Sequence, residues 1–60
     1  MYTVTYRTKK GGSGQLTTND ISKVRNKLRA QQREGCRANA YHNNSKIGEC
    51  DGKNWYLSEE

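Results

Sequence analysis

The sequence predicts an α+β fold of two layers, in which one helix packs on a small, mainly antiparallel sheet. Three observations lead to this class: an alternating N-terminal segment, one segment with an apolar stripe of helical period, and short alternating segments separated by turn signals. The expected order of elements is β-α-β-β-β, within a single domain of residues 1–60.

The first strand is expected over residues 2–8, where Tyr2, Val4 and Tyr6 alternate with polar residues. Such alternation is typical of a half-buried strand built from good strand formers. The segment 9–15, KKGGSGQ, follows with three glycines and two lysines, and we expect it to be a flexible Gly-rich loop.

The helix has clear start and stop signals. Thr17 at the N-cap would place Asp20 at the third helical position, and Leu16 and Ile21 would then occupy the two positions of a hydrophobic staple. Gly35 is the natural end. The stripe expected to face the sheet contains Ile21, Val24 and Leu28.

Three short strands should complete the sheet. They are expected over 36–42, 46–50 and 54–58, and turn signals separate them at Asn43-Asn44 and at Asp51-Gly52. The expected core is Val4, Tyr2 or Tyr6, Leu16, Ile21, Val24, Leu28, Ala38, Ala40, Ile47, Trp55 and Leu57.

The core of this chain must be thin. Only seven of the 60 residues are Leu, Ile, Val or Phe, which is a composition typical of disordered chains. The absence of proline, the five aromatic residues and the consistent local patterns favour folding instead. We expect dimerisation, a partner or a disulfide to support such a small domain, and residues 59–60 to form a frayed tail.

The two cysteines leave alternatives open. A two-residue turn after His42 would pair Arg37 with Cys50 and place Cys36 and Cys50 on opposite faces, whereas a loop longer by one residue would allow a disulfide. Free thiols are the default in a reducing cytosol. Cys36, His42 and Cys50 make only three irregularly spaced zinc ligands, so we expect no metal site.

Positive charge is concentrated in the first part of the chain. Nine of the eleven Lys and Arg residues lie between Arg7 and Arg37, so residues 1–37 carry a net charge of +7 and residues 38–60 a net charge of −2. The positive charge of the helix could serve only to keep a solvent-exposed face soluble. A row of arginines, however, favours the binding of phosphate or carboxylate groups, which guanidinium binds in a bidentate manner. The expected contact residues are Lys23, Arg25, Lys27, Arg29 and Arg33, with Asn26 beside them and Lys9, Lys10 and Arg37 in support.

These patterns predict a non-catalytic basic module that contacts nucleic acid phosphates through its helix. His42 has no oriented partner for catalysis, so we expect no enzyme and no cofactor. Tyr41 and Tyr56 are candidates for the outer sheet face, where aromatic rings can stack on bases. No secretory signal or membrane span is visible, and we expect a complete, short cytoplasmic protein.

The layout also resembles small phage-encoded accessory proteins, in particular anti-CRISPR proteins of the type I-F kind. The shared features are an N-terminal strand, a basic helix opening with Leu16-Thr17, a cysteine just after the helix and a closing hairpin on Asp51-Gly52-Lys53-x-Trp55. The Gly-rich loop is longer, and the strand region before the helix shorter, than in that pattern.

This resemblance implies an alternative function, that of an inhibitor that docks on a host protein or nucleoprotein complex. Lys23 and Arg25 would then occupy or guard a nucleic-acid path of the target. The partner would be an acidic protein surface or a nucleoprotein, in the cytoplasm of the host cell.

Overall fold

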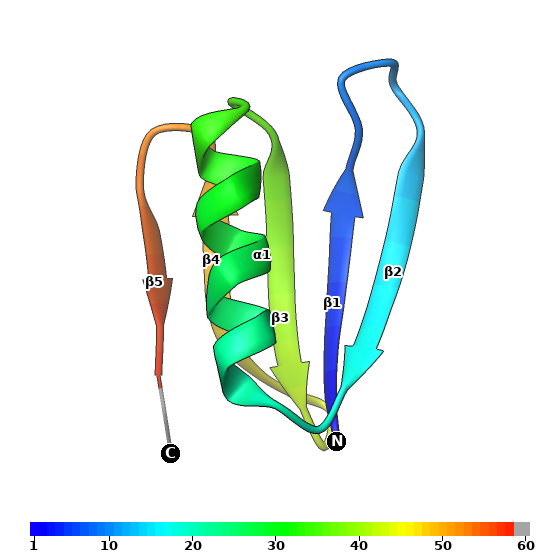
Figure 1. The fold of residues 1–60 in the computed structure, drawn as a ribbon, viewed down its shortest axis with the longest axis vertical. Helices are drawn as coiled ribbons and strands as arrows, with labels where there is room; N and C mark the ends of the chain where they lie inside the picture. Colours follow the sequence, from blue (N-terminus) through cyan, green and yellow to red (C-terminus); the bar gives the residue numbers. More distant parts are fainter. Residues whose placement is uncertain (59–60) are drawn as a thin grey trace.

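The computed structural model describes residues 1–58 as one helix packed against a five-stranded antiparallel sheet (Figure 1). The expected two-layer α+β class is confirmed, although the order of elements is β-β-α-β-β-β. The elements are β1 (Tyr2–Arg7), β2 (Ser13–Thr18), α1 (Ile21–Arg33), β3 (Arg37–His42), β4 (Ser45–Asp51) and β5 (Trp55–Leu57). The predicted tail at 59–60 lies outside the described residues.

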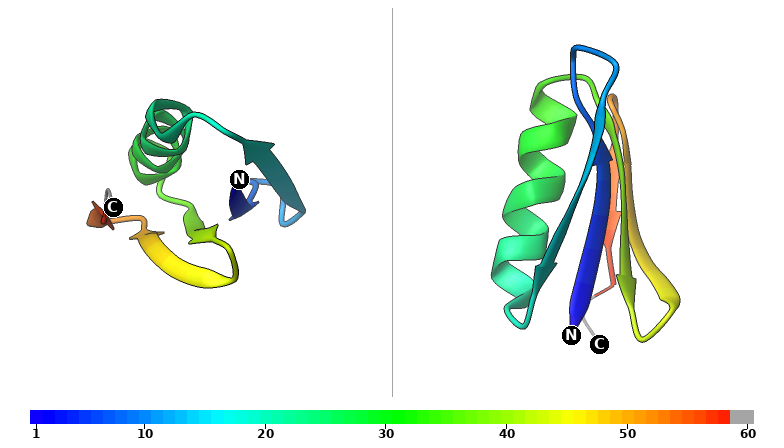
Figure 2. Two further views of the ribbon diagram at one scale, coloured as in Figure 1. Left: turned by 90° about the horizontal axis from the view of Figure 1, so that it is seen from below. Right: turned by 90° about the vertical axis from the view of Figure 1, so that its right-hand side faces the viewer.

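The strands lie in the order β2-β1-β3-β4-β5, so the first strand of the chain is inside the sheet. It pairs antiparallel with both β2 and β3. The connection through α1 therefore leads from an edge strand to the centre of the sheet. The helix covers one face, and no helix or strand of the described residues lies on the other face (Figure 2).

The predicted loop at 9–15 is partly wrong, because Ser13 begins β2. Glycine obscured the alternation of this strand in the sequence. The ring of Tyr6 lies opposite Gly14, where a side-chain Cβ would come within 2.5 Å of it. The aromatic ring thus fills the place of the missing side chain, and the glycine fits a strand. The turn that remains is held by the Thr8 amide, which donates to the Gly12 carbonyl at 3.0 Å.

The helix begins later than expected. Asp20 is the N-cap, and its side chain accepts a hydrogen bond of 2.9 Å from the Ser22 amide. Thr17 belongs to β2 instead, so the predicted capping box is wrong. The end of the helix is as expected: Gly35 has a φ of 76°, a left-handed conformation that glycine adopts without strain.

The core forms between α1 and the covered face of the sheet. All of the expected core residues are buried or packed against the buried cluster, including both Tyr2 and Tyr6. Leu28 and Val24 of the helix are completely buried, as is Val4 of β1. Cys50, which the sequence did not place in the core, is 1% exposed. Its burial follows from an irregularity in the β3–β4 pair.

That irregularity decides the arrangement of the cysteines. Tyr41 pairs with Lys46, but Ala40 pairs with Gly48, so one extra residue of β4 shifts the register. Cys50 consequently lies opposite Ala38, and neither of the two expected registers occurs. Both thiols are free, and the Cys50 thiol is a weak donor to the Cys36 carbonyl oxygen at 3.3 Å.

The two thiols should react at very different rates. Burial raises the pKa of the Cys50 thiol above its ordinary value, whereas the Cys36 side chain is partly exposed. Because the thiolate is the reactive form, we expect iodoacetamide to modify Cys36 first and Cys50 only when the protein opens. Peptide mass mapping against time would measure this, with the Cys36→Ser variant as the control. Equal rates for the two thiols would contradict the burial of Cys50.

The turn between β4 and β5 depends on the Asp51 carboxylate. It accepts hydrogen bonds from the Asn54 amide at 2.8 Å and the Lys53 amide at 3.0 Å, and these bonds lower its pKa. A lowered pKa in the folded state gives stability that is present above the unfolded pKa and lost as the pH falls through the folded value.

We therefore expect Asp51→Ala to destabilise the protein at pH 7, and the difference from the unaltered protein to shrink as the pH falls through the lowered pKa of Asp51. Urea unfolding at several pH values would measure it. A difference that persists at low pH would mean that the carboxylate charge is not what stabilises the turn.

Candidate nucleic-acid interface

The outer surface of α1 carries Arg29 and Arg33, the two exposed members of the row of helix arginines Arg25, Arg29 and Arg33. Arg29 and Arg33 are both exposed and, with Asn26 and Ala30, line a shallow depression of about 250 Å³. Lys23 lies exposed one to two turns earlier on the same helix. The helix holds five Lys and Arg residues and no Asp or Glu between Ile21 and Arg33. Its outward surface is therefore cationic along its whole length.

The other two helix bases lie on its flanks. The Lys27 ammonium is 3.9 Å from the centroid of the Tyr6 ring, which is a cation–π contact with β1. Arg25 is partly buried and shares the opposite flank with Gln32, whose side-chain amide donates to the Lys53 carbonyl at 2.9 Å. Lys27 and Arg25 therefore contribute to packing as well as to charge, a double role that the sequence did not indicate.

The supporting bases gather at the end of the molecule where the helix finishes. The β1–β2 turn that carries Lys9 and Lys10 lies at this end, at the top of Figure 1. Arg37 begins β3 beside it. A depression of about 420 Å³ is lined there by Arg7, Thr8, Lys9, Glu34, Gly35, Cys36 and Arg37.

Arg7 is a functional candidate that the sequence analysis did not select. It ends β1, and its exposed side chain faces away from the helix, as the alternation of that strand already indicated. Its sequence signal is the same positive charge that marked Lys9, Lys10 and Arg37, together with its place on the polar side of β1. With Lys9 and Arg37, Arg7 gives the end depression three bases against one acid, Glu34.

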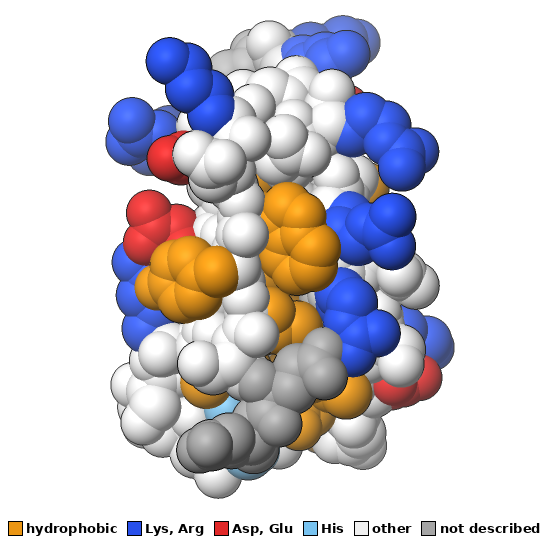
Figure 3. All heavy atoms as spheres, turned by 90° about the vertical axis from the view of Figure 1, so that its left-hand side faces the viewer, with side chains coloured by type: hydrophobic (Ala, Val, Ile, Leu, Met, Phe, Trp, Pro, Cys, Tyr) orange, Lys and Arg blue, Asp and Glu red, His pale blue; other side chains and the backbone are white. Residues whose placement is uncertain are grey.

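The predicted set therefore forms a belt and not a single patch. Lys and Arg side chains lie along the helix side and around the upper end of the molecule, with apolar side chains between the helix and β5 (Figure 3). The belt runs from the outer surface of α1, over the end that carries Lys9 and Lys10, to Arg37 on the uncovered face. A flexible polyanion can follow such a surface, whereas a flat rigid partner meets only part of it.

His42 and the possible metal ligands were the other candidate site residues in the sequence. The His42 ring stacks on Tyr2, with centroids 4.5 Å apart, so it is a packing residue at the end of the sheet. Within residues 1–58, no group of three or more His, Cys, Asp or Glu side chains is placed to hold a metal ion. The helix is too short and too polar to cross a membrane.

The chain was compared with protein-family models, with curated protein sequences and with solved structures. None of the three comparisons finds a match to it.

Proposed function

We propose that this protein is a non-catalytic binding module that holds nucleic acid by its phosphates, with the outer surface of α1 as the main contact. The observation that carries the proposal is the exposed pair Arg29 and Arg33 on a helix with five bases and no acid. Asn26, exposed beside them, adds a side-chain amide that can donate to a phosphate oxygen.

The energetics of the helix support a role beyond solubility. Arg25 and Arg29, and Arg29 and Arg33, are like-charged neighbours four residues apart, and each such pair destabilises a helix by about 0.2–0.5 kcal/mol. Arg33 in the last turn gains a little from the helix dipole, but Arg25 and Arg29 do not. Guanidinium groups bind phosphate in a bidentate manner, which gives a reason to keep arginines in this arrangement.

Contacts of this kind give affinity but little sequence preference. Phosphate contacts position a protein on nucleic acid and make its binding depend steeply on salt. The outer surface of α1 offers mainly charged side chains, so we expect it to bind many sequences with similar affinity.

Fluorescence anisotropy with labelled duplex DNA, single-stranded DNA and RNA, at several salt concentrations, tests the proposal. We expect binding at low salt and a steep linear decrease of log K with log salt. Absence of binding to all three probes at low salt would contradict it. The basic surface would then be a protein-docking surface, as the resemblance to anti-CRISPR proteins implies, and a host nucleoprotein complex would be the partner to test.

A further inference from the structure

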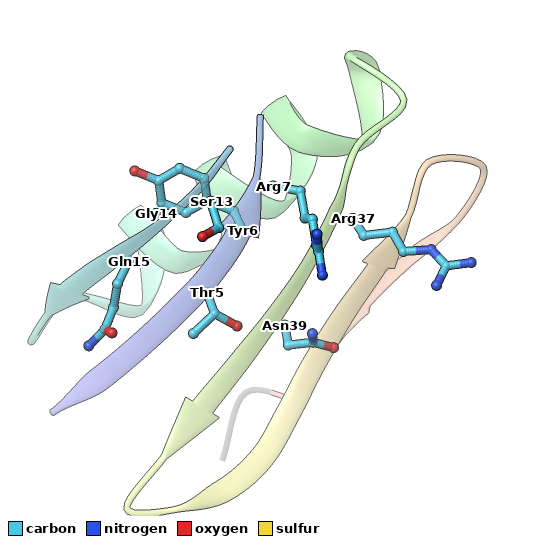
Figure 4. Close-up of a pocket in the computed structure, with 8 residues that line it drawn as sticks. All are labelled: Thr5, Tyr6, Arg7, Ser13, Gly14, Gln15, Arg37 and Asn39. Atoms are coloured by element: carbon cyan, nitrogen blue, oxygen red, sulfur yellow. The ribbon is translucent and has the colours of Figure 1, made fainter. Parts of the chain in front are cut away.

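The uncovered face of the sheet carries an ordered polar surface that the basic helix does not explain. Strand alternation directs Val4, Ala38 and Ala40 towards α1, so their neighbours along β1 and β3 point away from it. A depression of about 660 Å³ lies over β2, β1 and β3, within the size range of small-ligand sites. Figure 4 shows the side chains of Thr5, Arg7, Gln15 and Asn39 on the side of the sheet opposite the helix.

The register of the strands arranges these side chains in rows. Thr5 pairs with Gln15 on one side and with Asn39 on the other, which gives a neutral row across three strands. Arg7 pairs with Ser13, and Arg37 directly precedes Ala38, the residue of β3 at which the pairing with β1 ends, so the adjacent row carries two bases. One row thus offers amides and a hydroxyl, and the next offers cations.

Four of these side chains make no hydrogen bond within the described part of the protein. Within residues 1–58, the side chains of Thr5, Gln15 and Asn39 make no hydrogen bond to the protein, and neither does that of Arg7. Arg37 extends towards β4, where Asp51 is its cross-strand partner (Figure 4). The like charges of Arg7 and Arg37 on neighbouring strands destabilise the sheet, and Asp51 beside Arg37 offsets part of this cost.

The surface continues in both directions from this depression. At one end it shares Arg7 and Arg37 with the end depression that contains Lys9, and thus joins the basic belt. At the other end it shares Gln15 with a second depression of about 480 Å³, which Tyr41 also lines. Phosphate-binding groups, base-edge groups and an aromatic ring therefore follow one another along the β1 direction.

We propose that this face binds an unpaired segment of a single-stranded nucleic acid. The phosphates of the strand lie against Arg7 and Arg37. One base forms hydrogen bonds with Gln15 and Asn39, and the next base stacks on Tyr41. Carboxamides match the hydrogen-bonding edges of a base that is not paired, and aromatic rings stack on bases of any kind. A duplex hides these edges, so the face selects single strands.

The inference rests on the proposed function and adds selectivity to it. The helix would bind the phosphates of any nucleic acid, and the sheet face would favour a single strand. The acids of the same face, Glu49 and Asp51, lie on β4, and Glu49 forms an ion pair with Lys46. They confine the strand to the β2–β1–β3 part of the sheet.

The test compares three double variants in anisotropy titrations of single-stranded and duplex DNA. Arg7→Gln with Arg37→Gln should weaken single-strand binding roughly 25-fold at about 0.1 M salt, from two phosphate contacts, and weaken duplex binding much less. Arg29→Gln with Arg33→Gln removes the same charge from the outer surface of α1 and should weaken the binding of both single strands and duplex. Gln15→Ala with Asn39→Ala should change the order of affinity among the four homopolymers, which a change of charge alone does not do.

Three outcomes would overturn the inference while leaving the proposed function intact. The first is an equal loss for single strands and duplex in the Arg7 and Arg37 variant. The second is an NMR titration of the unaltered protein with a short single strand in which only amides of α1 shift, and those of Thr5 and Asn39 do not. A mononucleotide that binds as tightly as an oligonucleotide would likewise exclude a strand as the ligand. If only the helix variants lose binding, α1 is the contact surface and the sheet face does not bind the strand.

Discussion

Replacing Arg29 and Arg33 together with glutamine is expected to weaken duplex DNA binding roughly 60-fold at about 0.1 M salt, because each lost phosphate contact lowers the slope of log K against log salt by about 0.9. Both side chains are exposed on the outer surface of α1, so their removal leaves the core unchanged. Glutamine retains much of the length of arginine and favours a helix almost as well. Circular dichroism should therefore show an unchanged helix.

The matched control is the Lys46→Gln and Lys53→Gln double variant, which has the same net charge. Lys46 is on β4 and Lys53 in the β4–β5 turn, away from the outer surface of the helix. If both double variants lose the same affinity, binding responds to the net charge of the protein and α1 is not the site. If only the arginine variant loses affinity, and loses it for both duplex and single strand, the helix is the general phosphate contact.

The fold class followed from the sequence because apolar periodicity and turn signals agree in most of this chain. The apolar stripe of Val24 and Leu28 and the alternation of β1 are local patterns, which do not depend on the order of the strands in the sheet. Two details depended on contacts that no local pattern contains. Gly14 is acceptable in a strand only because Tyr6 covers it, and the register of Cys50 depends on one extra residue in β4.

The helix part of the candidate site could be predicted from the sequence, but the sheet part could not. The helix bases could be found from charge alone, and the exposed positions of Arg29 and Arg33 follow from helical spacing. The order of strands could not be found in this way. Only the insertion of β1 between β2 and β3 places Gln15, Thr5 and Asn39 in one row, since these residues are 10 and 24 positions apart along the chain.

Leu28→Ala is expected to have the largest effect on stability. The Leu28 side chain is completely buried, and it reaches the sheet at Gly48, where its Cδ1 atom would lie 3.1 Å from an added Cβ. Truncations of this kind destabilise proteins by about 2–5 kcal/mol. A domain of this size has a free energy of unfolding of roughly 3–9 kcal/mol, so a large part of its stability should be lost. Urea unfolding followed by circular dichroism would measure the change.

Leu16→Ala provides the control for that loss, because it removes the same atoms from a side chain that is only partly buried on the edge strand β2. We expect a clearly smaller loss there, and equal losses would contradict a core centred under α1. The same pair of variants separates folding from binding. Leu28 holds the basic helix on the sheet, so nucleic acid binding should fall in proportion to the unfolded fraction. The Arg29 and Arg33 variant should lose binding while remaining folded.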